Sequence, residues 1–92
     1  MIIYNVTTNV ERAYHDEWLH WMRHKHVPDL MATGLFVKHQ VLRLLSEEEN
    51  GITYAFQYYL RSQEDLESYE NTYAPIFRAE IQQRYRDRLV SF

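Results

Sequence analysis

The feature that most constrains the fold is a pair of strand patterns in the middle of the chain, separated by a short charged turn. Leu35 to Leu45 is largely apolar and has a strand pattern, Ile52 to Arg61 is rich in β-branched and aromatic residues, and Ser46 to Gly51 reads SEEENG. Strands that flank so short a connection ending in Asn-Gly pair as an antiparallel hairpin. The sequence therefore predicts an antiparallel sheet built around this hairpin.

The register of the hairpin decides which side chains share a face of the sheet. The second strand carries one strongly apolar set of alternate residues, and we expect Leu42 and Leu44 to lie beside Tyr54 and Ile52, with His39 beside Gln57. A shift by one residue would turn every side chain to the opposite face. The apolar set consists of Ile52, Tyr54, Phe56, Tyr58 and Leu60.

The first part of the chain predicts a strand followed by a helix. Ile2 to Thr8 consists mostly of β-forming residues, and Asn9 is a candidate helix N-cap. From there apolar residues recur at helical spacing, which predicts a helix that packs this face on the sheet. The residues of this face are Val10, Tyr14, Trp18, Trp21 and Met22.

Two prolines predict breaks in the helical regions. Pro28 disfavours helical geometry at the residue before it, so the first helix should end near His24 to His26, with a short helical piece from Pro28 to Ala32. Ser62 to Asp65 forms a capping-box pattern that opens the last helical region, where Pro75 should kink or split the helix near Tyr73-Ala74. Leu89 to Phe92 resembles the start of another strand.

The predicted order is β-α-β-β-α-β, a ferredoxin-like α+β arrangement with one antiparallel sheet and two helices on one face. A chain of 92 residues forms one domain, which we take as residues 1–92. No predicted helix of the chain covers the other face of the sheet. In so small a chain, we expect a second copy of the same chain to cover this face. The sequence therefore predicts a homodimer through the open sheet face.

Composition excludes several classes of function. A net charge of −3 gives no general field that attracts nucleic acid, and no apolar run approaches the roughly 20 residues of a membrane span. The absence of cysteine excludes disulfides and thiolate chemistry and fits a cytoplasmic location. The N-terminus lacks the basic start and long apolar stretch of a signal peptide. We expect no nucleic-acid or membrane partner.

Several short motifs resemble a family of uncharacterised bacterial proteins in the dimeric α+β barrel superfamily, which also contains the antibiotic biosynthesis monooxygenases. The motifs are Tyr4-Asn5-Val6-Thr7, His26-x-Pro28-x-Leu30-x-x-Thr33-Gly34-x-Phe36, Tyr73-Ala74-Pro75 and the ending at Phe92. The resemblance implies two sheets that face each other in a dimer, with a cavity between sheet and helices. It implies no particular activity, because the superfamily includes cofactor-free monooxygenases, isomerases, heme enzymes and ligand-binding regulators.

Six residues are candidates for a ligand site. His26 and His39 are candidate catalytic residues, because an imidazole can exchange protons near neutral pH. His26 follows the aromatic helix and precedes Pro28, so it could face a cavity or cap the helix. Polar groups in an apolar concavity fix the orientation of a small ligand, and aromatic rings stack on it. The candidates are Asn5, Trp21, His26, His39, Gln57 and Tyr59.

A metal site is not expected, although Glu17, His20 and His24 share one side of the first helix. These residues offer at most three ligands, and the last helix carries Glu80 but no histidine to complete a set. We therefore predict neither a metal nor another cofactor. The sequence favours a dimer that binds a small molecule between sheet and helices. The alternative is an enzyme similar to a cofactor-free monooxygenase or isomerase, acting on a small aromatic or polyketide-like substrate.

Overall fold

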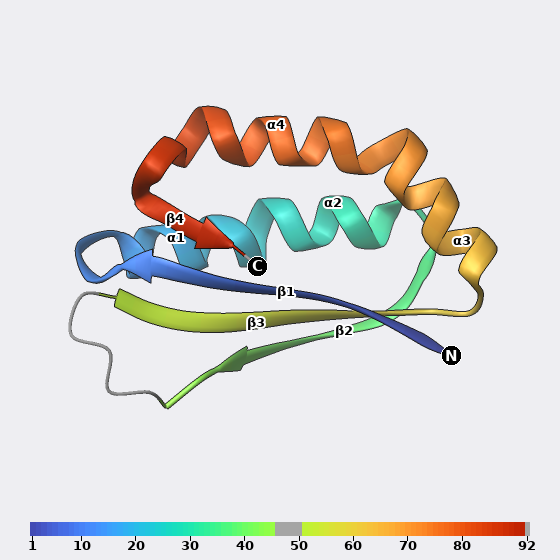
Figure 1. The fold of residues 1–92 in the computed structure, drawn as a ribbon, viewed down its shortest axis with the longest axis horizontal. Helices are drawn as coiled ribbons and strands as arrows, with labels where there is room; N and C mark the ends of the chain where they lie inside the picture. The colour runs from blue at the N-terminus through green and yellow to red at the C-terminus, as the bar shows by residue number, and fades with distance from the viewer. Residues whose placement is uncertain (46–50, 92) are drawn as a thin grey trace.

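The computed structural model describes residues 1–45 and 51–91, and in these residues four strands form one antiparallel sheet (Figure 1). In space the strands follow the order β2-β3-β1-β4, so the two long central strands are flanked by β2 and the short β4. The prediction of an α+β fold with one antiparallel sheet is confirmed. The strands are β1 (Ile2–Glu11), β2 (Phe36–Arg43), β3 (Gly51–Leu60) and β4 (Leu89–Ser91).

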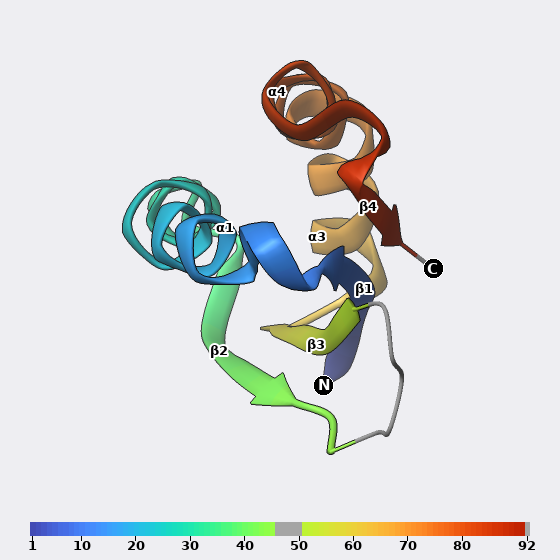
Figure 2. The same cartoon turned by 90° about the vertical axis from the view of Figure 1, so that its left-hand side faces the viewer.

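Two helical regions cover one face of the sheet and leave the other face open (Figures 1 and 2). The first region comprises η1 (Arg12–Tyr14), α1 (His15–Trp21), the π-helical turn η2 (Met22–His26) and α2 (Val27–Ala32). The second comprises α3 (Gln63–Ser68), the π-helical turn η3 (Tyr69–Tyr73), α4 (Ala74–Tyr85) and η4 (Arg86–Arg88). The largest fully buried side chains are Trp18, Leu30, Phe56, Tyr58, Leu60, Tyr85 and Val10.

The first strand is longer than the sequence predicted. Asn9 lies within β1 opposite Thr53, so the prediction that it caps the first helix is wrong. Val10 is also a strand residue, paired with both Ile52 and Leu89. Pairing with two neighbouring strands extends β1 past the point at which the local helical pattern begins.

The first helical region does not end near His24 to His26, which corrects the prediction made from Pro28. The backbone N–H of Val27 donates to the carbonyl oxygen of Met22, five residues earlier, and α2 continues through Pro28. In a regular α-helix Pro28 would lack a hydrogen bond, and its ring would clash with the carbonyl group four residues earlier. The wider π turn before Pro28 changes this local geometry, so the helix can continue. Pro75 lies at the start of α4, where the sequence placed a break.

The predicted register of the hairpin is wrong by one residue over most of its length. Phe36 lies opposite Leu60, but an irregularity between Phe36 and Lys38 shifts the strand, so that His39 lies opposite Tyr58. Gln57 therefore lies opposite Gln40 rather than His39. The predicted charged turn falls outside the described residues except for Gly51. The shift separates His39 from Gln57, which occupy opposite faces of the sheet.

Candidate functional site

A cavity of about 260 Å³ lies between the sheet and the two helical regions. Its exposed lining residues, Arg78, Gln82 and Ser91, belong to α4 and β4, so the cavity opens on that side. The rest of the lining is mainly apolar or aromatic. These residues are Tyr4, Val6, Thr8, Trp18, Met22, His26, Leu30, Phe56, Tyr58, Tyr69, Phe77, Ile81 and Leu89.

Three buried polar atoms without a partner belong to residues that line this cavity. Trp18, His26 and Tyr58 are 0%, 6% and 1% exposed. Within residues 1–45 and 51–91, no hydrogen-bond partner lies within reach of Trp18 Nε1, His26 Nδ1 or the Tyr58 hydroxyl. Buried polar groups are nearly always paired with protein, water or ligand, since each orphan costs roughly 1–3 kcal/mol. The walls of the cavity therefore contain buried hydrogen-bonding groups that the described protein does not use.

His26 is the last residue of the η2 turn, and its ring lies between two aromatic neighbours. Its centroid is 5.9 Å from that of Trp21, in a stacked arrangement, and 5.9 Å from that of Phe77, edge to face. Burial lowers the pKa of His26 from 6.5 to about 4; the nearby Asp29 carboxylate opposes this and Lys25 adds to it. The ring is therefore neutral at pH 7, and a neutral imidazole has one nitrogen that can donate and one that can accept a hydrogen bond.

Tyr58 extends from β3 toward the helices and stays protonated over the physiological range. Burial is the main cause that raises its pKa well above the usual value, and the neighbouring Tyr69 and Tyr4 hydroxyls raise it further. Its ring packs against Phe36 with a centroid distance of 5.2 Å. Trp18 packs edge to face on Phe56 at 5.5 Å. Both side chains are fixed by the core, so their polar atoms have defined positions.

Among the residues that the structure describes, Arg78 is the charged side chain at the mouth of the cavity. The Arg78 guanidinium donates to both carboxylate oxygens of Glu70 at 3.0 Å and to the Tyr4 hydroxyl at 3.1 Å. On the β1–β4 side of the cavity, the hydroxyls of Thr8 and Ser91 are hydrogen-bonded to each other at 2.9 Å. Arg78, Thr8 and Ser91 are thus paired within the protein, unlike the buried polar atoms of Trp18, His26 and Tyr58.

The structure does not bring the six predicted site residues together. Only His26 lines the cavity. Trp21 does not line the cavity but stacks on His26, and the Arg84 guanidinium lies 5.3 Å from the centroid of the Trp21 ring. His39 lies at the edge of the sheet in a separate shallow pocket with Arg23. The other three lie on the open face of the sheet: Asn5, Gln57 and Tyr59.

The open-face candidates form a polar strip across three strands. Gln57 lies between Asn5 on β1 and Gln40 on β2, and the Tyr59 hydroxyl donates to the Gln40 side chain at 3.3 Å. Lys38 lies 4.4 Å from the centroid of the Tyr59 ring. This strip is separated from the cavity by the sheet itself, so the two surfaces are distinct.

Sequence reasoning missed Trp18 and Tyr58 as cavity residues. It placed both on apolar faces, where each was interpreted as core. The available signal was the chemistry of the side chains, because tryptophan and tyrosine usually pair their N–H or O–H when buried. The N–H and O–H groups of a buried face that contains tryptophan or tyrosine need hydrogen-bond partners, whereas a face of leucine or phenylalanine needs none.

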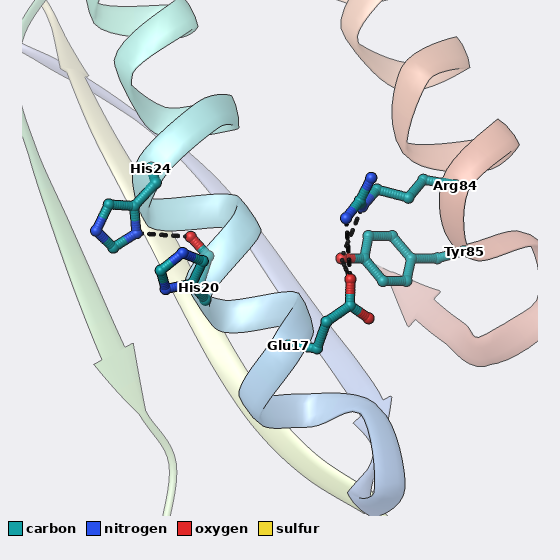
Figure 3. Close-up of polar contacts among 5 residues, drawn as sticks. All are labelled: Glu17, His20, His24, Arg84 and Tyr85. Atoms are coloured by element: carbon teal, nitrogen blue, oxygen red, sulfur yellow. Dashed lines mark hydrogen bonds and ion pairs between the residues drawn. The ribbon is translucent and has the colours of Figure 1, made fainter.

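The predicted cluster of Glu17, His20 and His24 does not converge on one point (Figure 3). Glu17 points toward the second helical region, where it accepts from Arg84 and Tyr85. His20 and His24 stack with centroids 4.1 Å apart, and His24 Nδ1 lies 2.9 Å from the carbonyl oxygen of His20. In the part of the chain that the structure describes, no group of three histidine, cysteine, aspartate or glutamate residues is placed to hold a metal.

Comparison with known proteins identifies a family across the whole chain. The family described as a domain of unknown function, DUF4286, matches residues 1–92. The chain belongs to DUF4286. No curated protein matches it, and no solved structure does. Among the described residues of this DUF4286 chain, no helix has the length and apolar character needed to cross a membrane.

Proposed function

We propose that the protein binds a small organic molecule in the cavity between its sheet and its helices. The observation that carries this proposal is the set of three unpaired buried polar atoms, on Trp18, His26 and Tyr58, in residues that line one mainly apolar cavity. A cavity that combines apolar walls with a few polar groups is the usual form of a small-ligand site. The opening beside Arg78 gives a ligand access from solvent.

Binding is favoured over the enzyme alternative, a reaction similar to that of a cofactor-free monooxygenase or isomerase. A general base works best when its pKa is near the working pH. Burial holds the pKa of His26 at about 4, which makes it a weak base. His39, the other candidate, lies outside the cavity.

We further propose a ferredoxin-like homodimer of the dimeric α+β barrel type, formed through the open sheet face. This proposal is supported by the arrangement of both helical regions on one face (Figure 2). The open face carries half-buried Gln57 and Tyr59 beside Ile3, which is 52% exposed. A second copy would cover this mixed surface and leave the cavity on the far side of the sheet accessible.

A fragment screen with a matched pair of variants tests ligand binding. Ile81→Trp fills the cavity from α4, whereas Ile76→Trp adds the same group on the exposed side of α4. Ligand-observed NMR of a mixed fragment set should detect fragments that bind the wild-type protein and Ile76→Trp but not Ile81→Trp. Circular dichroism establishes that both variants are folded. If no fragment binds, or binding survives in folded Ile81→Trp, the proposal is wrong.

A further inference from the structure

We propose that the ligand of this cavity is an uncharged, mainly apolar molecule of one or two rings that carries at least one hydrogen-bond acceptor, such as a ketone oxygen. This inference rests on the proposed function and specifies the chemistry of the ligand. It follows from the charge of the lining, from the kinds of unpaired atoms and from the volume.

The lining offers no free charge to a ligand. Among the described lining residues, Arg78 is the one with a formal charge at pH 7, and its guanidinium is neutralised by Glu70 at 3.0 Å. His26 is neutral at this pH, as is Tyr58. A carboxylate or ammonium group that entered the cavity would lose its hydration without gaining a counter-charge, and this costs several kcal/mol. The lining therefore selects against ions of either sign.

The unpaired atoms favour a ligand that carries an acceptor. The indole Nε1–H of Trp18 can only donate, and the protonated Tyr58 hydroxyl can donate or accept. His26 Nδ1 donates or accepts according to its tautomer. A saturated hydrocarbon would fill the space but leave the Trp18 donor unsatisfied. A ligand with a carbonyl oxygen pairs with at least one of these donors and keeps its apolar part against the remaining walls.

The volume limits the ligand to a small molecule. The cavity of about 260 Å³ lies just below the range of about 300–1,000 Å³ that is usual for drug-sized ligands. At roughly 30 Å³ for each water, it corresponds to a cluster of about nine waters. Such a cluster is the competing occupant, because water could also satisfy Trp18, His26 and Tyr58.

Four probes of similar shape separate these possibilities. Acetophenone carries a ketone oxygen, ethylbenzene lacks an acceptor, benzoate is an anion and 1-phenylethylamine is a cation. In isothermal titration of the wild-type protein, acetophenone should bind about tenfold more tightly than ethylbenzene, the difference expected for one hydrogen bond. Both ions should bind more weakly than acetophenone.

Two neighbouring tyrosines provide the matched variants. Tyr58→Phe removes the unpaired hydroxyl in the cavity, and Tyr59→Phe removes a hydroxyl on the open face that is bonded to Gln40. Tyr58→Phe should weaken acetophenone binding about fivefold and reduce its advantage over ethylbenzene, while Tyr59→Phe keeps the wild-type affinity. Tyr58→Phe should remain folded, since it removes a buried group that lacks a partner.

The outcomes distinguish this inference from the proposed function. Equal or tighter binding of benzoate or 1-phenylethylamine would overturn the inference, as would equal affinities for acetophenone and ethylbenzene. Absence of binding by all four probes would also overturn it. In each case the fragment screen with Ile81→Trp and Ile76→Trp decides separately whether the cavity binds small molecules at all.

Discussion

The hydroxyl of Tyr85 donates to a carboxylate oxygen of Glu17 at 3.1 Å, which joins the last turn of α4 to the first turn of α1 (Figure 3). The same oxygen accepts from the Arg84 guanidinium at 3.0 Å. Glu17 is thereby held on the side of its helix that faces the second helical region. The two helical regions meet here through long side chains, near the buried ring of Tyr85.

This contact leads to a prediction about metal content. Glu17 is bonded to Arg84 and Tyr85. His20 and His24 therefore remain as an exposed pair that no third ligand among the described residues completes. A stable transition-metal site needs more ligands in a defined geometry. Elemental analysis of protein purified without an affinity tag should find well below one zinc, iron, nickel or copper per chain. A stoichiometric metal that is lost in His20→Ala would contradict this prediction.

A second prediction concerns the pH dependence of stability. The unfolded chain binds a proton at His26 near pH 6.5, but the folded chain does so only near pH 4, because burial disfavours the charged ring. The unfolded state therefore holds more protons between these values, and the free energy of unfolding falls by up to about 3 kcal/mol as the pH is lowered from 6.5 to 4. Above pH 6.5 this group contributes no further change.

Urea unfolding at a series of pH values measures this effect. His26→Gln, which has no titrating ring, should show a smaller loss of stability between pH 6.5 and 4 than the wild-type protein. His39→Gln removes an exposed histidine and serves as the control. If His26→Gln keeps the wild-type pH dependence, His26 is not the cause of the loss of stability between pH 6.5 and 4.

A third prediction concerns the start of β3. A Cβ atom added at Gly51 would lie 2.4 Å from Oδ1 of Asn9, whose side-chain amide donates to the Thr53 hydroxyl at 3.0 Å. Gly51→Ala should force the Asn9 side chain to turn away and should lower the free energy of unfolding by about 1–3 kcal/mol. Chemical denaturation measures the change.

The background Asn9→Ala isolates the cause of this loss. If the clash with the Asn9 side chain is responsible, Gly51→Ala should cost clearly less in an Asn9→Ala protein than in the wild type, and a double-mutant cycle gives the difference. Equal costs in the two backgrounds would show that the backbone of Gly51, and not the contact with Asn9, sets the requirement for glycine.

A fourth prediction tests the proposed dimer. Light scattering coupled to gel filtration should give a mass of twice 11.3 kDa at micromolar concentration. Gln57→Arg places a charge at the centre of the open face and should shift the mass toward the monomer, because two copies would bring like charges together. Gln83→Arg makes the same change on exposed α4 and should leave the mass unaltered. A monomeric wild-type protein would refute the proposal.

The strand patterns were sufficient to predict the antiparallel sheet and its hairpin, because alternating apolar residues specify a sheet with one buried face. The register was not predictable, because nothing in the sequence around Phe36 and Lys38 signals the irregularity that shifts it. His26 was selected by its place before Pro28, and it does line the cavity. Trp18 and Tyr58 were not selected, because core packing and cavity lining produce the same periodicity.

The two π turns change the phase of the helices that follow them. Met22 and Val27 are both buried although they are five residues apart, and each π turn precedes a proline. His26 and Leu30, four and eight residues after Met22, are buried as they would be in a regular α-helix, and the π turn adds Val27 to this buried face. Lys25 and Asp29 form an ion pair beside it that stays partly exposed. The extra residue rotates α2 by about 100°. Deleting one residue from this turn would rotate α2 by about 100° in the opposite sense and would turn the buried side chains of Val27 and Leu30 away from their present positions in the core.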